Sequence, residues 1–272
     1  MGKHVVQALV EAVSKGEDVK VVVGTRAPQA LSCSSVLESV QCDMSSPASL
    51  QAAIAGAKCQ RVFLCLPQCL APRDMVAASK VVVDAAVEAG VDLLVRVGSL
   101  GQADQGPLGE AHEACEEYCR ERALPVTSIR PTSFHVNFEK YDVDSIKNEN
   151  CFRSPLGPSA RVNWVHCGDV GRVAAALMLQ EQVEQVVEVT GPAESCLSTG
   201  QMADLLTQEL GRSVRYEEVE APGLQEYEQL WSFLKKGGFD SCSGAQTVVR
   251  MTGQQPVGFH HVVRQLMETG SL

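Results

Sequence analysis

The chain has 272 residues, of which 45% are hydrophobic and 21% are charged, and its formal net charge is −10 at pH 7. This length and composition predict a globular protein with one large or two small domains. The acidic balance and the lack of a basic cluster argue against nucleic acids and anionic membranes as partners. No apolar run is long enough to span a bilayer, and no charged-then-apolar leader opens the sequence.

The eleven cysteines are scattered through segments that we expect to be buried, not spaced as a disulfide framework. An odd count without a leader favours reduced thiols and a cytoplasmic location. His112, Cys115 and Cys119 share one helical stripe, but a structural zinc site needs four convergent ligands and no second pair is visible. We therefore expect no metal, and we interpret the two cysteines as small core residues.

Strands and helices alternate through the first half, which predicts an α/β fold built on a Rossmann-like, doubly wound parallel sheet. The apolar run 93–97 has the pattern of a strand buried on both faces, and it ends at Gly98-Ser99. In open α/β sheets the carboxyl ends of the strands form the edge where ligands bind. The expected strands cover 18–24, 36–42, 61–66, 93–97 and 125–129, and the expected helices cover 2–16, 48–57, 74–90 and 108–123, the last with a stripe of Ala111, Cys115, Cys119 and Ala123.

The second half is predicted to form a smaller C-terminal α/β region over 139–272, after a Rossmann-like domain over 1–138. Segment 139–158 is irregular and polar, which favours a loop on the substrate side. Asp169 is predicted to cap a helix over 170–179, and Ser198 with Gln201 predicts a capping box for a helix that ends at Gly211. Further strands are expected at 162–166, 186–190 and 213–219, and segment 162–191 is expected to return to the main sheet. Three short helices are expected from Leu224 onward, with apolar anchors at Phe233, Phe239, Phe259 and Leu266.

Short motifs between residues 97 and 138 indicate a family. They are Val97-Gly98-Ser99, Pro107-Leu-Gly-Glu-Ala-His112, Glu116-Glu-Tyr118, Leu124-Pro-Val-Thr127, Ile129-Arg-Pro131 and Asn137-Phe138. This set resembles the NmrA-like, atypical branch of the short-chain dehydrogenase/reductases, which includes quinone and triphenylmethane reductases. The resemblance extends over nearly the whole chain.

The start of the chain departs from that family. Gly2 and the helix after it resemble the last glycine and the helix of a glycine-rich dinucleotide motif. The preceding strand and glycines, on the order of a dozen residues, have no counterpart, so the resemblance predicts a hole in the sheet between strands 18–24 and 61–66. An incomplete gene model, a short isoform or a variant that closes the gap would each explain this, and we favour the first.

The resemblance implies an N-terminally incomplete NAD(P)-binding domain over 1–138 and a substrate-side region over 139–272, with NADP(H) as the cofactor. Thr25-Arg26 stands at the end of the second strand of such a fold, where no acid is present to bond the 2′-hydroxyl of NAD and an arginine suits the 2′-phosphate of NADP. The alternative for Arg26 is a solvated surface residue. Asp43 resembles the family's aspartate near the adenine ring, and its alternative is a helix-initiating or turn aspartate. The alternative for Leu66-Pro67 is an ordinary strand end, and Arg130 is interpreted as structural. The implied cofactor contacts are Gly2, Thr25, Arg26, Asp43, Leu66, Pro67, Gly98 and Pro131.

Two residues are the catalytic candidates. Ser99 occupies the position of the serine that orients a carbonyl in ordinary short-chain dehydrogenases, but their Tyr-x-x-x-Lys pair is missing, because Tyr118 is followed by Cys-Arg-Glu-Arg. His112 lies where the quinone-reductase relatives also carry a histidine, and it could hold a substrate oxygen. The alternative for His112 is a helix-face residue satisfied by a loop carbonyl.

The resemblance therefore predicts an NADP(H)-dependent oxidoreductase that transfers hydride to a quinone-like or other conjugated small molecule. The alternative is a non-catalytic NADP(H)-binding redox sensor that acts through a protein partner. The missing Tyr-x-x-x-Lys pair favours the sensor, and the histidine motif favours the enzyme. A third possibility is that the chain as written neither binds cofactor nor catalyses.

Overall fold

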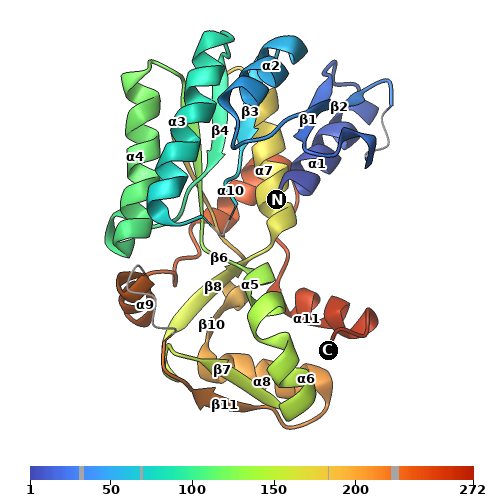
Figure 1. Cartoon of the computed structure of the whole chain (residues 1–272). Helices are drawn as coiled ribbons and strands as arrows, with labels where there is room; N and C mark the ends of the chain where they lie inside the picture. The colour runs from blue at the N-terminus through green and yellow to red at the C-terminus, as the bar shows by residue number, and fades with distance from the viewer. Residues whose placement is uncertain (31–33, 68–69, 183, 222–226) are drawn as a thin grey trace. The chain divides into compact units, whose positions relative to one another are not determined.

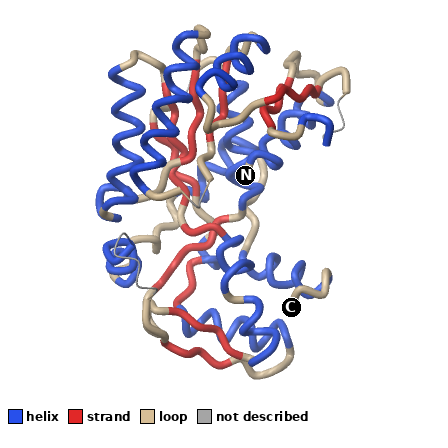
Figure 2. Tube along the Cα trace, viewed as in Figure 1, coloured by secondary structure: helices blue, strands red, loops and turns tan. Residues whose placement is uncertain are grey.

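The computed structural model describes residues 1–30, 34–67, 70–182, 184–221 and 227–272. The chain divides into two compact units (Figures 1 and 2). The N-terminal unit holds Met1–Gly98, Ala111–Ile129 and Gly171–Val186, and the C-terminal unit holds Ser99–Glu110, Arg130–Val170 and Val187–Leu272. The chain thus passes between the units several times, and each unit is described below by itself.

The N-terminal unit alternates helix and strand, as predicted. In chain order its elements are α1 (Gly2–Ser14), β1 (Val21–Thr25), η1 (Pro28–Ala30), β2 (Leu37–Gln41), α2 (Pro47–Ala57), β3 (Arg61–Leu64), α3 (Pro72–Glu88), β4 (Leu93–Val97), most of α4 (Pro107–Glu121) and β5 (Val126–Pro131), and the last part of α7 (Cys167–Leu179). Neighbouring strands pair in parallel, β1 with β2, β3 with β4 and β4 with β5, which confirms the Rossmann-like α/β class.

The main sheet has the strand order β3-β4-β5-β9, with β9 at Val186–Val189. β4 is interior to it, and Leu94 and Val95 are fully buried, as the unbroken apolar run predicted. Helices α2, α3 and α4 share one hydrophobic core with β3 and β4. The Arg61 guanidinium on β3 donates to the Met178 carbonyl at 2.9 Å, which ties the sheet to the end of α7.

The first two strands form a sheet of their own. β1 pairs only with β2, β3 pairs only with β4, and within the described residues no backbone hydrogen bond joins β1 to β3. The expected hole in the sheet is therefore confirmed. Val22 and Val23 show its effect, because they belong to an apolar run typical of an interior strand and yet are only half-buried.

The C-terminal unit holds two small sheets, with strand orders β10-β8-β6 and β11-β7. Its elements are η2 (Gln102–Gln105), β6 (Ser133–Phe134), α5 (His135–Tyr141), α6 (Val143–Glu149), β7 (Cys151–Ser154), β8 (Arg161–Val165), most of β9, η3 (Ala193–Ser195), β10 (Cys196–Ser198), α8 (Thr199–Leu210), β11 (Arg215–Glu218), α9 (Glu228–Lys235), α10 (Gly244–Thr252) and α11 (Phe259–Glu268). Its main core gathers Phe138, Ile146, Leu206 and Phe259.

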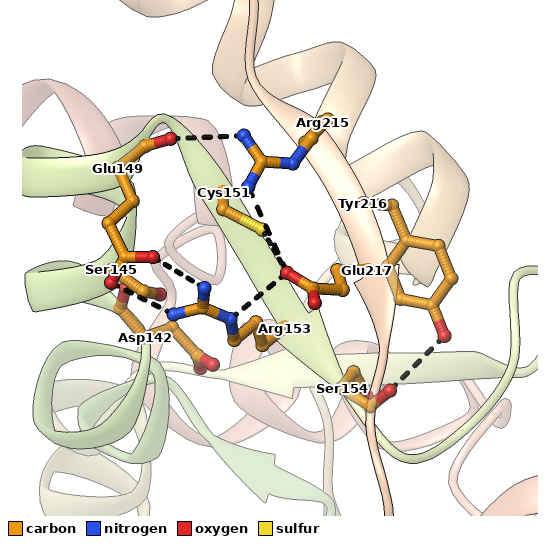
Figure 3. Close-up of polar contacts among 9 residues, drawn as sticks. All are labelled: Asp142, Ser145, Glu149, Cys151, Arg153, Ser154, Arg215, Tyr216 and Glu217. Carbon is orange, nitrogen blue, oxygen red and sulfur yellow. Dashed lines mark hydrogen bonds and ion pairs between the residues drawn. The ribbon is translucent and has the colours of Figure 1, made fainter.

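The prediction that 139–158 is irregular was wrong, because α6, β7 and the end of α5 lie within it. The two helices have seven residues each, too few to repeat an apolar period visibly, but Phe138 and Ile146 are fully buried. Polar contacts join the end of α6 to the small sheet (Figure 3). Arg153 on β7 donates from Nη1 to Glu149 at 3.0 Å and from Nε to Glu217 on β11 at 3.1 Å.

The predicted cap of α7 was also wrong. The helix begins at Cys167, so Asp169 lies inside its first turn. The Asp169 carboxylate instead accepts the Val257 amide at 2.8 Å, while the Gly168 amide donates to His166 Nδ1 at 3.0 Å. The imidazole of His166 thus does the capping that was expected of the aspartate.

Other local predictions can be compared directly. The capping box of Ser198 and Gln201 is confirmed, and α8 ends at Gly211 in the left-handed conformation. Cys115 and Cys119 are core residues, each 1% exposed, but Ala123 lies beyond α4 and is exposed, so it is not part of the buried stripe.

Residues 227–272 hold the three expected short helices, α9, α10 and α11. Their expected start at Leu224 lies outside the described residues. Of the helices in the described part of the chain, none combines the length and apolar character that a bilayer crossing needs.

Candidate functional site

The carboxyl ends of β1 and β2 bring Arg26 and Asp43 together. Two hydrogen bonds from Ser45 lower the pKa of Asp43, the hydroxyl at 2.7 Å having the larger effect and the amide at 2.9 Å the smaller, and the Arg26 guanidinium lowers it a little further. The carboxylate is therefore committed to a turn that leads into α2, where Ser46 caps the helix. This geometry supports the turn interpretation of Asp43, and its contact with a cofactor stays a prediction.

Arg26 is exposed, and it immediately follows β1. The Thr25 hydroxyl oxygen accepts a hydrogen bond from the Ala27 amide at 3.2 Å, and this bond stabilises the turn that contains Arg26. Neither residue is acidic. The end of β1 thus offers a solvent-accessible cation and no acidic residue of its own, and the nearby carboxylate is that of Asp43 at the end of β2.

The start of α1 acts electrostatically on the residue that follows β3. Burial raises the pKa of the Cys65 thiol, and the charge of the Met1 α-amino group acts in the opposite direction. Gly2, the first residue of α1, is exposed, and Met1 at the N-cap makes no side-chain cap. A helix N-terminus favours anions, and a cofactor contact at Gly2 stays a prediction.

β3 ends earlier than predicted, at Leu64, so Leu66 and Pro67 belong to the loop that follows it. Leu66 still packs against the core of the N-terminal unit, and exposed Pro67 accepts the Leu70 amide at 3.3 Å. Gly98, just after β4, is buried and donates its amide to the Ile129 carbonyl at 2.7 Å. The backbone at these positions is thus held by local hydrogen bonds.

A buried polar cluster surrounds His112. Arg96 on β4 is 1% exposed and His112 on α4 is 9% exposed. Arg96 donates from Nη2 to His112 Nδ1 at 3.0 Å and from Nη1 to Ser128 Oγ at 3.2 Å, and it pairs with Glu116 at 3.2 Å. A side chain of β4 therefore holds one nitrogen of the histidine.

Sequence reasoning missed Arg96, because it stands inside an apolar run that was interpreted as a buried strand. A signal was present, since a single cation in such a run needs buried partners. His112 and Glu116, one turn apart on the helix that follows, are two of the side chains that bond to it.

Ser99 and Pro131 belong to the C-terminal unit. The Gln105 amide donates to Ser99 Oγ at 2.8 Å and also to the Leu100 carbonyl, and Gln105 is fully buried. The Leu100 amide donates to the Pro131 carbonyl at 2.9 Å, which fixes the loop after β4 beside the end of β5. Gln105, which the sequence gave no reason to select, thus orients the serine hydroxyl.

Tyr118 is engaged elsewhere. Its hydroxyl donates to Asp84 on α3 at 2.8 Å, and this hydrogen bond raises the pKa of Tyr118. The contact joins α3 to α4, which agrees with the expectation that Tyr118 does not serve as a proton donor. No group of three or more metal-ligating side chains is found among the residues that the structure describes; Cys33 and Cys69 lie outside them.

Comparisons with known proteins agree with this geometry. The model of the NmrA-like family matches residues 1–233. No curated protein sequence matched the chain. A solved structure of the NADPH-dependent quinone oxidoreductase of Escherichia coli, complexed with NADPH, is similar at 20% identity and a TM-score of 0.81, covering 98% of this chain and 96% of that one.

Two further structures have the same fold. Triphenylmethane reductase of Citrobacter sp., complexed with NADP(H), is 19% identical, with a TM-score of 0.77 and 97% of this chain and 95% of that chain covered. A nucleoside-diphosphate-sugar epimerase from Staphylococcus aureus is 16% identical, with a TM-score of 0.78 over the same shares of the two chains. These likenesses establish the Rossmann-like fold.

Proposed function

The chain belongs to the NmrA-like family, and on this premise we propose that it is an NADP(H)-dependent oxidoreductase that transfers hydride to a quinone-like or other conjugated small molecule. The reductases with similar structures, which are complexed with NADPH or NADP(H), support the proposal. The observation that carries it is the exposed Arg26 guanidinium at the carboxyl end of β1, without an acid beside it in the sequence.

The cofactor would be held at the edge formed by the ends of the parallel strands. Arg26 would bind the 2′-phosphate, Asp43 would lie near the adenine, and the start of α1 at Gly2 would face the pyrophosphate. The loop at Leu66 and Pro67, with the backbone at Gly98 and Pro131, would line the remainder.

Ser99 and His112 are the proposed substrate contacts. A guanidinium can only donate, so His112 Nδ1 accepts from Arg96, and the neutral imidazole carries its proton on Nε2. Such an N–H can bond to a carbonyl oxygen that gains negative charge as hydride arrives. The cofactor, when bound, supplies the hydride. Reduction of a quinone depends on hydride transfer more than on a precisely placed acid, so the missing Tyr-x-x-x-Lys pair does not argue strongly against this activity.

The second candidate is a non-catalytic NADP(H)-binding regulator that acts through a protein partner. It is favoured by the engagement of Tyr118 with Asp84, which leaves α4 without the proton donor of ordinary short-chain dehydrogenases. Both candidates require NADP(H) binding. They differ in whether the bound cofactor is consumed.

Calorimetric titration of NADPH and NADH into the folded 272-residue chain tests the cofactor. We expect NADPH to bind more tightly, and Arg26→Ala to weaken NADPH by about 10- to 100-fold, the value of a charge-assisted hydrogen bond, with little effect on NADH. Arg73→Ala is the matched control, because the Arg73 side chain is 87% exposed and lies on α3. No binding by a folded chain would overturn both candidates.

Steady-state oxidation of NADPH with a panel of quinones then separates the two candidates. The enzyme consumes NADPH in proportion to the acceptor, whereas the regulator binds NADPH without consuming it. Binding without turnover across the panel would overturn the reductase and leave the regulator.

A further inference from the structure

Two cysteines from distant parts of the sequence meet at one backbone carbonyl in the C-terminal unit. Cys196 Sγ on β10 lies 3.2 Å from the Asp240 carbonyl oxygen, and Cys242 Sγ, just before α10, lies 3.8 Å from the same oxygen. Each thiol is thus within 4 Å of the same oxygen atom, and the presence of Cys242 contributes to the raised pKa of Cys196. Both are reduced in this structure. The chain thus holds two sulfur atoms side by side that no part of the proposed reaction uses.

The surroundings of the pair are polar. Arg161 Nη2 donates to the Cys196 carbonyl at 2.6 Å, and Asn163 Nδ2 donates to Cys242 Sγ at 3.5 Å. Burial raises the pKa of the Cys196 thiol, and a hydrogen bond from Arg161 acts in the opposite direction. An arginine therefore lies beside Cys196, and an amide donor bonds to the sulfur of Cys242.

The exposure of the two thiols is unequal. Cys196 is 4% exposed, whereas Cys242 is only half-buried. This asymmetry is typical of a pair in which the more exposed thiol, here Cys242, reacts with an oxidant from solvent and the buried thiol, here Cys196, reacts with the product. Cys115 and Cys119 on α4 are also neighbours, but each is 1% exposed, so a dissolved oxidant does not reach them.

We propose that Cys196 and Cys242 form a dithiol site that a hydroperoxide converts into an intramolecular disulfide. The Cys242 thiolate attacks the peroxide, so that an S–O bond forms as the O–O bond breaks and an alcohol or water leaves. Cys196 then attacks the resulting sulfenic acid, which forms the S–S bond and releases water. The peroxide is reduced by two electrons and the two thiols are oxidised. The site is independent of the NADP(H) proposal.

The disulfide would fasten the segment at Asp240 to strand β10. That segment leads directly into α10, whose first residue, Gly244, lies against the backbone of Thr190 at the end of β9. Oxidation would therefore fix the start of α10 relative to the sheet β10-β8-β6 of the same unit.

Treatment of the purified full chain with dilute hydrogen peroxide, followed by alkylation and peptide mass spectrometry, tests the proposal. We expect a Cys196–Cys242 linked peptide pair, lighter by about two hydrogens, that is lost on reduction with dithiothreitol. The variant Cys196→Ser should instead retain a dimedone-reactive sulfenic acid at Cys242, and Cys242→Ser should leave Cys196 unoxidised. Cys42→Ser and Cys59→Ser, which remove half-buried thiols of the other unit, should form the bond normally.

The opposite results are equally clear. If both thiols of the unaltered chain stay open to alkylation while Cys42 or Cys59 is oxidised, the proposal is overturned. It is also overturned if Cys242 stops at the sulfenic acid in the unaltered chain, or if Cys196 is found linked to a different cysteine. Because these readouts use the unaltered protein, a variant that fails to fold does not obscure them.

Discussion

Arg96 Nη2 lies 3.0 Å from His112 Nδ1, and both side chains are withdrawn from solvent. Strand β4 therefore sets the orientation of a histidine that the following helix carries. Because the same guanidinium also bonds to Glu116 and Ser128, the imidazole is held by a network of three elements, β4, α4 and β5. The network fixes which nitrogen of His112 holds the proton.

Replacing Arg96 with methionine should lower the free energy of unfolding by about 3–5 kcal/mol, because it leaves a buried carboxylate without its partner. The Glu116 side chain is only 12% exposed. Urea denaturation of the single variant and of the double variant Arg96→Met/Glu116→Gln measures the effect. We expect the double variant to recover much of the loss; equal instability of the two would contradict a charge-pair origin.

Replacing His112 should slow quinone reduction without abolishing NADPH binding. His112→Leu removes the Nε2–H donor and should lower kcat about tenfold, the cost of one hydrogen bond to developing charge. His112→Gln can keep an N–H donor and should retain more activity than the leucine variant. Stopped-flow oxidation of NADPH checks both, and identical rates in all three proteins would exclude His112 from the substrate site.

Gly109→Ala should destabilise the protein by about 3 kcal/mol, as expected when a new atom is forced into a filled space. A Cβ at Gly109 would lie 1.4 Å from the Gln102 carbonyl oxygen, so α4 and the η2 turn would have to separate. Gly56→Ala in α2 is the matched control, because nothing lies within 4 Å of its Cβ. The control should gain about 0.5–1 kcal/mol from helix propensity. Thermal unfolding curves of the two variants should therefore move in opposite directions.

Asp142, between α5 and α6, should make stability depend on pH (Figure 3). Burial raises the pKa of its carboxyl from 3.8 to about 7. Between these values the folded protein keeps a proton that the unfolded chain releases, so stability falls as pH rises and the whole penalty is present above pH 7.

Asp142→Asn removes that penalty. The melting temperature of this variant minus that of the unaltered protein should increase as pH rises from about 4 to 8. The increase should be about 2–4 °C for each kcal/mol of penalty that the substitution removes. Differential scanning calorimetry at the two ends of this range measures the difference. A gap between the two proteins that does not change with pH would show that the carboxyl does not titrate there.

The sequence revealed most where a local rule decides the structure. Ser198 and Gln201 predicted the start of α8 because a capping box uses only residues one turn apart. Asp169 misled by the same rule, since its partner is the Val257 amide, far along the chain. The short helices α5 and α6 were missed because each buries few side chains and is fixed mainly by packing within the C-terminal unit.

The candidate site was predicted in part. Ser99 and His112 were selected by their positions in the sequence. The hydroxyl of Ser99 is oriented by Gln105 from a neighbouring turn, and the imidazole of His112 is held by Arg96 from a neighbouring strand. Such pairings depend on tertiary contacts, which spacing alone does not reveal. Asp43 differs, because its bonds to Ser45, two residues further on, are local and match the turn interpretation that the sequence offered.

The break between β1 and β3 also affects how the protein fluctuates. Two backbone ladders that share no hydrogen bonds, in the part of the chain described, need not open in one cooperative event. Amide protons of β1 and β2 should exchange with deuterium quickly, through a local opening. Those of interior β4 should exchange more slowly, because their exchange requires disruption of the main core. The N-terminal unit would then consist of two foldons, and a ligand that binds across both should slow exchange in the weaker one most.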